Sequence, residues 1–282
     1  MKLTRKSFIK TAGLGLGATF ASPLSSHGNS SVSKVNNDIT FRLGIASYSL
    51  RGYDFANALA ITKRVNISSI ALKSMHMPMK SSDAELSSTA MKVRDAGIDL
   101  YGAGVIYMKT AEEVENAFRY ASASGIKVII GVPGHDLLPL VEKKVKETDV
   151  KLAIHNHGPG DDVYPSPESV YEKIKDMDKR MGLCIDIGHT IRIGLDPAEN
   201  IKKYADRLYD LHIKDVNVAS PEGTNIEIGR GVIDIPSVLQ ALIDIKYEHI
   251  VAFEFEKDEN DVIPGLSESV GYVHGVLDSI SA

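Results

Sequence analysis

Histidines and carboxylates gather in four short motifs in the second half of the chain, each within or just after an apolar run. The motifs read His155-Asn156-His157, Asp186-Ile187-Gly188-His189, His212-Ile213-Lys214-Asp215 and Glu254-Phe255-Glu256. An ionisable group buried beside an apolar run is unfavourable without a partner, because desolvation disfavours its charge. A divalent cation would be a partner for all of these imidazoles and carboxylates together. The motifs therefore predict a metal site.

The spacing within the motifs is compatible with one shared site. Residues two apart on a strand face the same way, so His155 lies on the same side as His157, and His212 on the same side as Lys214. Each residue alone has a simpler interpretation, since a lone histidine is more often a hydrogen-bonded structural residue and Asp186 could cap a helix. Four consecutive strands that all end in this way favour a metal site over coincidence.

Short β-branched runs alternate with amphipathic stretches from Phe41 onward, and this alternation predicts eight strands that are each followed by a helix. The strands are expected at residues 41–47, 68–73, 100–105, 127–131, 151–156, 182–187, 208–213 and 250–255. The helices are expected at residues 55–64, 84–96, 111–123, 137–146, 169–177, 197–207, 235–245 and 267–280.

This pattern predicts a single α/β domain, a (β/α)8 TIM barrel over residues 38–282, with a doubly wound open sheet as the alternative. An open sheet that binds a nucleotide usually has a glycine-rich phosphate loop after its first strand. Residues 46–51 occupy that turn and read Ala-Ser-Tyr-Ser-Leu-Arg, which favours the barrel. In a barrel the C-terminal ends of the strands share one active-site bowl, so the four motifs are expected to meet there.

The motifs resemble those of the xylose-isomerase-like TIM barrel superfamily, the sugar phosphate isomerase/epimerase family, over nearly the whole chain after residue 40. The resemblance implies a divalent metal held by a glutamate after strand five, an aspartate after strand six, a histidine on strand seven and a glutamate on strand eight. Matched position by position, the ligands in this chain are His155, Asp186, His212 and Glu254. His155 stands in the place of the first glutamate.

His155 changes both the charge of the site and the mechanism that the resemblance implies. The epimerases of the family use their two glutamates to move protons on opposite faces of the substrate, and this chain keeps only Glu254 of that pair. Two carboxylates just neutralise a divalent ion, whereas the three carboxylates of the family over-neutralise it. The ion in this chain is therefore expected to be the stronger Lewis acid. Two imidazoles and two carboxylates suit manganese, cobalt, zinc or iron better than magnesium, which prefers oxygen ligands.

The other polar residues at the strand ends have expected roles around this metal. Glu254, His157 and His189 are the candidate acid/base residues, because an imidazole titrates near neutral pH and a carboxylate can also move a proton. The candidates for binding substrate hydroxyls or an enediolate are Lys73, His76, Lys214, Arg230 and Glu256. The predicted function is proton abstraction next to a metal-chelated carbonyl of a sugar or keto-sugar, which gives isomerisation or epimerisation.

Three other functions remain open at this stage. A keto-glycoside lyase or hydratase would need only one base and a strong Lewis acid. A non-catalytic sugar-binding barrel would need no base at all. Metal-dependent hydrolysis of nucleic acid, as in the abasic-site endonucleases that share this barrel, is disfavoured because the net charge is −5 and no basic run is present.

Residues 1–37 differ in composition from the rest and predict an export signal followed by a flexible tail. A basic start precedes a small apolar run at residues 11–21 and then a stretch rich in serine and asparagine. The apolar run is shorter than the roughly 20 residues of a membrane span. Residues 4–10 resemble a twin-arginine motif with Lys6 at the second arginine, so a periplasmic location is expected, with a disordered cytoplasmic extension as the alternative. The sequence leaves the oligomeric state open.

Overall fold

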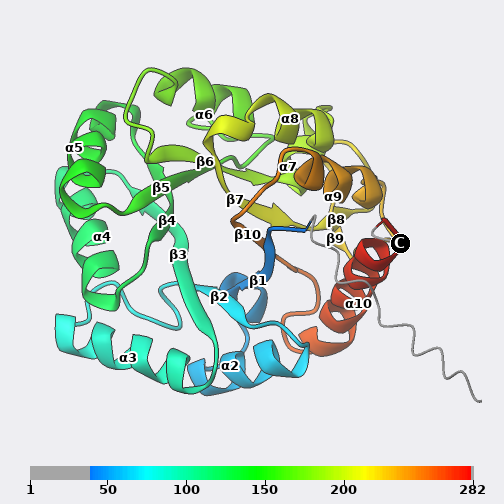
Figure 1. Ribbon diagram of the computed structural model, residues 1–282, viewed down its shortest axis with the longest axis horizontal. Coiled ribbons are helices and arrows are strands. Elements are labelled where there is room, and N and C mark those ends of the chain that lie inside the picture. Colours follow the sequence, from blue (N-terminus) through cyan, green and yellow to red (C-terminus); the bar gives the residue numbers. More distant parts are fainter. Residues whose placement is uncertain (1–38, 281–282) are drawn as a thin grey trace, which may run out of the picture. The chain divides into compact units, whose positions relative to one another are not determined.

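The computed structural model describes residues 39–280, which form a closed barrel of parallel strands inside a ring of helices (Figure 1). The barrel strands are β1 (Arg42–Ala46), β2 (Ser69–Leu72), β3 (Asp99–Met108), β4 (Val128–Pro133), β5 (Lys151–His155), β6 (Met181–Asp186), β7 (Leu208–Ile213) and β10 (Ile250–Phe253). Their order around the barrel is β1-β10-β7-β6-β5-β4-β3-β2, so the first strand pairs with the last and closes the sheet. The predicted TIM barrel is confirmed.

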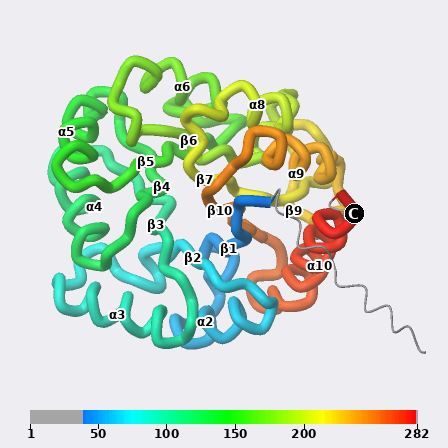
Figure 2. The backbone as a smooth tube through the Cα atoms, viewed as in Figure 1, coloured from blue at the N-terminus to red at the C-terminus, as the bar shows by residue number. Residues whose placement is uncertain are grey.

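The helices follow the strands along the chain and lie outside them, as the tube in Figure 2 shows. They are α2 (Phe55–Arg64), α3 (Asp83–Asp95), α4 (Ala111–Ser124), α5 (Leu138–Thr148), α6 (Pro167–Ile174), α7 (Ile187–Arg192), α8 (Pro197–Lys203), α9 (Ile235–Asp244) and α10 (Val262–Ile280). No helix among residues 39–280 combines the length and the apolar composition that crossing a membrane requires. The predicted signal and tail, residues 1–37, lie outside the described residues.

Local sequence signals explain where several helices begin and end. Ser82 and Thr110 each accept a hydrogen bond from a backbone N–H of the first turn, and glutamates three residues later complete two capping boxes. Gly125 ends α4 with φ = 73°, a left-handed conformation that glycine adopts without strain. Such caps each contribute about 1 kcal/mol, so the helix boundaries are encoded locally.

The strands bury apolar residues on both faces, which is typical of a barrel with helices outside it. One apolar cluster fills the space between strands and helices, and a smaller one lies inside the barrel. The interior cluster consists of Ala46, Ala71, Tyr101, Ile130, Ala153, Cys184, Ile250 and Ala252. Four of these eight residues are alanines, and the barrel interior is packed with side chains.

Two features that the sequence analysis did not predict lie near the C-terminal ends of the strands. Helix α7 begins directly after β6, where the analysis expected the strand to continue. After β7, strands β8 (Asp215–Val216) and β9 (Asn225–Ile226) form an antiparallel pair. Both features contribute residues to the cavity described below.

Candidate metal centre and active site

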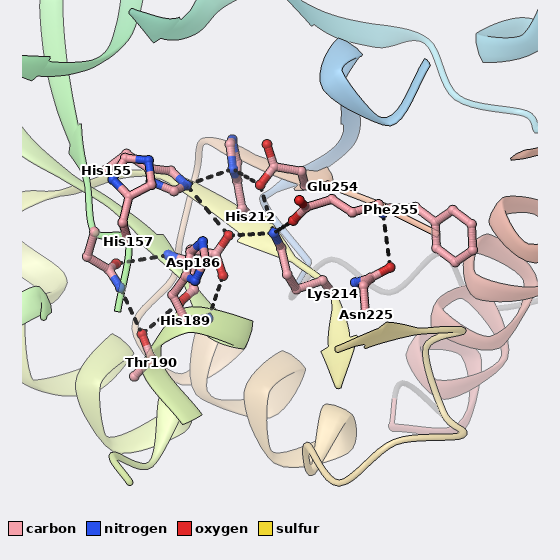
Figure 3. Close-up of polar contacts among 12 residues, drawn as sticks. His155, His157, Asp186, His189, Thr190, His212, Lys214, Asn225, Glu254 and Phe255 are labelled. Atoms are coloured by element: carbon pink, nitrogen blue, oxygen red, sulfur yellow. Dashed lines mark hydrogen bonds and ion pairs between the residues drawn. The ribbon is translucent and has the colours of Figure 1, made fainter. Parts of the chain in front are cut away.

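Four buried side chains converge at the C-terminal end of the barrel (Figure 3). His155 and Asp186 are the last residues of β5 and β6, His212 is the penultimate residue of β7, and Glu254 follows β10 directly. One possible ligand atom from each lies within 4.8 Å of those of the others. The structure thus brings together the four residues that the sequence analysis assigned to a metal.

The distances within this cluster are short, and burial and neighbouring charges together set the pKa values of its side chains. His155 Nε2 lies 3.1 Å from His212 Nδ1 and 3.5 Å from Asp186 Oδ2, and His212 Nδ1 lies 3.1 Å from Glu254 Oε2. Burial lowers the pKa of His155 to about 4, so this imidazole is neutral at pH 7. Burial alone would raise the pKa of Glu254, but His212 and Lys214 outweigh it and hold that pKa well below its usual range.

The cluster fits a divalent metal because it combines two buried imidazoles with two carboxylates whose pKa values are held low, so that both carboxylates are ionised. Asp186 Oδ1 accepts a hydrogen bond from the backbone N–H of His189 and so caps α7. Asp186 Oδ2 is buried and lies 3.5 Å from His155 Nε2 and 2.9 Å from the Lys214 ammonium. Two nitrogens and two oxygens form a donor set that suits zinc, manganese, cobalt or iron.

Lys214 enters the same cluster, although the sequence analysis assigned it to substrate binding. Its buried ammonium lies 2.9 Å from Asp186 Oδ2, 2.8 Å from Glu254 Oε2 and 2.5 Å from Glu256 Oε1. Burial would lower the pKa of Lys214, but these carboxylates together raise it well above its ordinary value. Gly188 makes room for the lysine stem, because a Cβ atom there would lie 2.6 Å from Lys214 Cδ.

The two histidines predicted as acid/base residues lie beside the metal ligands. The ring of His157 lies 4.5 Å from the ring of His155 and 5.8 Å from that of His189. His157 Nε2 is 2.9 Å from the Tyr107 hydroxyl, and its Nδ1 is 3.5 Å from Asp161 Oδ2. Burial lowers the pKa of both histidines, that of His157 to about 4, so both imidazoles are neutral at pH 7.

Of the other residues predicted to bind substrate, Lys73 lines a hollow, whereas His76 and Arg230 are engaged in contacts elsewhere. Lys73 lines a hollow of about 350 Å³ together with Tyr107. His76 is buried, and its two ring nitrogens face Ser47 Oγ and the Tyr53 carbonyl oxygen, each at 3.0 Å.

Arg230 is exposed and forms an ion pair with Glu268 on α10, with Nη2 2.7 Å from Oε2. Neither His76 nor Arg230 lines this hollow or the cavity between α7 and the β8–β9 pair, and their assignment to substrate binding stays a prediction. In both residues the polar groups are engaged in contacts that hold the fold.

Sequence reasoning missed Tyr107 and Asn156 at this site. Tyr107 lies on β3 two residues past the predicted end of that strand, although an apolar run continued there and could have revealed the longer strand. Asn156 Oδ1 accepts a hydrogen bond from the backbone N–H of Asp186 and so links the ends of β5 and β6. Its position between two histidines was the signal available in the sequence.

A cavity of about 540 Å³ opens beside the cluster, between α7 and the β8–β9 pair. Its lining is Gly188, His189, Arg192, Lys214, Val216, Gly223, Thr224, Asn225, Glu256 and Lys257. The volume is that of a small-molecule site. Seven of these ten residues have charged or polar side chains, which suits a molecule rich in hydroxyl groups.

Comparison with known proteins gives one family and several relatives. A family model described as a xylose isomerase-like TIM barrel matches residues 55–273. The inosose dehydratase of Clostridium perfringens is 26% identical over 225 residues, which cover 62% of this chain and 75% of that protein.

Two solved structures share the fold at 17% sequence identity and a TM-score of 0.70. One is an L-ribulose 3-epimerase, with 84% of this chain and 95% of that chain covered. The other is the IolI protein with a bound zinc atom, with 85% and 98% covered. At this identity the likeness shows that the barrel architecture is shared.

Proposed function

Because the chain belongs to the xylose isomerase-like TIM barrel family, we propose that it is a metal-dependent enzyme that removes a proton next to the carbonyl of a small sugar or keto-polyol. The observation that carries this proposal is the convergence of His155, Asp186, His212 and Glu254 on one point beside a polar cavity. These four residues would hold the metal, which when bound polarises the substrate carbonyl and acidifies the adjacent C–H. The zinc atom bound by the IolI protein supports a transition metal.

The arrangement of proton-accepting groups favours elimination of water over epimerisation. Epimerisation needs a second group to return a proton from the opposite face, and His155 occupies the position of that group as a metal ligand. Glu254 is a weak proton acceptor, because His212 and Lys214 hold its pKa well below the usual range. Burial lowers the pKa of His157 to about 4, but this imidazole is neutral, lies beside the cluster and is not paired with Lys214 as Glu254 is, so we assign the role of base to it.

In the proposed dehydration, His157 accepts the proton from the carbon next to the carbonyl. The C–O bond at the following carbon then breaks, and a double bond forms between the two carbons. Protonated His157 returns its proton to the departing hydroxyl, which leaves as water, so the imidazole ends the cycle neutral. The dehydratase activity named for the Clostridium perfringens relative supports this reaction class, with a polyhydroxylated ketone as the substrate.

Isomerisation is the second candidate, because His189 lies 5.8 Å from His157 and offers another neutral imidazole for proton transfer. One experiment distinguishes dehydration from isomerisation. Protein loaded with zinc, manganese, cobalt or iron(II) is incubated in deuterated water with inososes, ketoses and 3-keto-glycosides. Loss of a hydroxyl group as water supports dehydration, and release of an aglycone from a keto-glycoside would also place the enzyme among the lyases. Deuterium incorporation without any loss indicates an isomerase or epimerase.

The control for this experiment is His157→Gln, which removes the base and leaves the four proposed ligands in place. Dehydration should fall by at least about a hundredfold in this variant, the usual contribution of a general base. Sugar binding without turnover or deuterium exchange under every metal would contradict the proposal and favour a non-catalytic sugar-binding barrel.

A further inference from the structure

Asp210 is a fully buried carboxylate inside the barrel, one layer below the candidate metal centre. It lies two residues before His212 on β7, so both side chains point into the barrel. In the register of the sheet its neighbours are Cys184 on β6 and Ile250 on β10. Both neighbours belong to the apolar interior cluster, so Asp210 is a carboxylate in apolar surroundings.

The contacts of Asp210 with this cluster are weak. The Tyr101 hydroxyl lies 3.4 and 3.5 Å from its two oxygens, and Cys184 Sγ lies 3.8 Å from Oδ2. Long contacts of this kind do not compensate for taking a carboxylate out of water. Stability therefore gives no reason for an aspartate at this position, and a role in the site above it is the better explanation.

The neighbour above Asp210 is His212. Asp210 Oδ2 lies 3.7 Å from His212 Nε2, and Nε2 has no hydrogen-bond partner in the part of the chain that the structure describes. The other ring nitrogen, Nδ1, lies 3.1 Å from both Glu254 Oε2 and His155 Nε2. The imidazole thus points one nitrogen at the cluster and the other at Asp210.

We infer that Asp210 is a positioning residue, which holds the ring of His212 so that Nδ1 faces the metal. A histidine that binds a metal through one nitrogen carries its proton on the other, and a carboxylate that accepts this proton fixes both the tautomer and the ring orientation. A shift of about 1 Å between the two side chains brings Nε2 and Oδ2 to hydrogen-bond distance. This inference rests on the proposed function only in requiring a bound metal.

The test is the metal affinity of Asp210→Asn and Asp210→Ala, measured with zinc and manganese against a chromophoric chelator. Residues that hydrogen-bond to a metal ligand typically contribute about 10–100-fold to metal affinity. We therefore expect affinity to fall about tenfold in the asparagine variant and further in the alanine variant. Tyr101→Phe is the matched control, because it removes a hydroxyl that contacts Asp210 but not His212. Its affinity should stay within about twofold of the unchanged protein.

Thermal unfolding of the metal-free variants separates positioning from a merely structural role. Positioning predicts weaker metal binding while the metal-free Asp210→Asn protein is as stable as the unchanged one. The inference is overturned if both variants bind metal as tightly as the control, whether or not their melting temperature falls. Failure of the unchanged protein to bind metal would overturn it together with the proposed metal centre. Tight metal binding without turnover would contradict only the proposed reaction.

Discussion

The ammonium of Lys214 lies 2.8 Å from Glu254 Oε2, the same oxygen that lies 3.1 Å from His212 Nδ1. The candidate metal centre therefore shares its carboxylates with a cation supplied by the chain. Glu256 Oε1, at 2.5 Å from the ammonium, offers Lys214 a carboxylate outside the four proposed ligands. Metal affinity should depend on how these charges are distributed.

Replacing Lys214 with methionine should tighten metal binding, because the change keeps the length of the side chain and removes a positive charge beside the ion. We expect about a tenfold gain in zinc affinity, equivalent to about 1.4 kcal/mol, and a lower melting temperature of the metal-free protein, whose buried carboxylates lose their partner. Lys144→Met on α5 removes ion pairs with Glu115 and Glu147 and should leave metal affinity unchanged. Weaker metal binding in Lys214→Met would show instead that the ammonium holds the carboxylates in place.

His155→Glu should move the metal preference toward magnesium. The substitution adds a third carboxylate and removes an imidazole, and magnesium prefers oxygen ligands. The ratio of magnesium to zinc affinity should rise at least about tenfold, as measured by calorimetric titration of both ions. His155→Gln serves as the control, since it removes the imidazole without adding charge. An unchanged ratio would argue that His155 is not a ligand.

Tyr107→Phe should slow turnover more than it weakens substrate binding. The Tyr107 hydroxyl lies 2.9 Å from His157 Nε2 and orients that imidazole, which is the proposed base. We expect kcat to fall about tenfold, with KM within about twofold of its original value. The exposed Tyr272, on α10, gives the control variant Tyr272→Phe. A change confined to KM would assign Tyr107 to substrate binding.

The metal-free protein should lose stability as the pH falls from about 6.5 to 4. Burial lowers the pKa of His155 from 6.5 to about 4 in the folded state, so the unfolded chain binds the proton more readily between these values. The contribution of the neutral His155 imidazole to the free energy of unfolding is therefore complete above pH 6.5. It falls by roughly 3 kcal/mol as the pH is lowered to 4. Urea unfolding across this range measures the change. His155→Gln should show a shallower slope, and an equal slope would contradict the assignment.

Residues 1–37 should direct the protein out of the cytoplasm and be removed in part. Expression of the full chain in a Gram-negative host, followed by fractionation and mass spectrometry, should find a shortened protein in the periplasm, with a new N-terminus near Ala21. Lys6→Gln together with Arg5→Gln should abolish export. An intact N-terminus in the cytoplasm would favour the alternative of a cytoplasmic extension.

Periodicity was sufficient to predict the barrel and the meeting of the four motifs at its end, and the family resemblance selected the four proposed ligands among them. Helix α2 and strand β7 have the predicted boundaries, because apolar runs and turn residues mark both of them clearly. The four residues are at or next to strand ends, where the barrel geometry alone forces side chains into one bowl. Strand position together with the family resemblance was therefore enough for these four.

The contacts around the cluster could not be predicted in the same way. Lys214 and Arg230 are both basic residues near the end of the barrel, yet one lies among the carboxylates and the other pairs with Glu268 on α10. That difference depends on Gly188, which makes room for the Lys214 stem, and on the β8–β9 pair, whose short strands carry little periodic signal. Tertiary packing decides such contacts, and local pattern does not encode it.

The four strands that carry the proposed ligands, β5, β6, β7 and β10, are consecutive neighbours around the barrel. A shift in the register of β7 against β6 would separate Asp186 from His212 at once, since the two are paired across those strands. Strands β2 to β4 form the opposite wall and carry none of the four. Mutations on that wall are therefore expected to spare metal binding, even where, as at Tyr107 on β3, they change a contact of the proposed base.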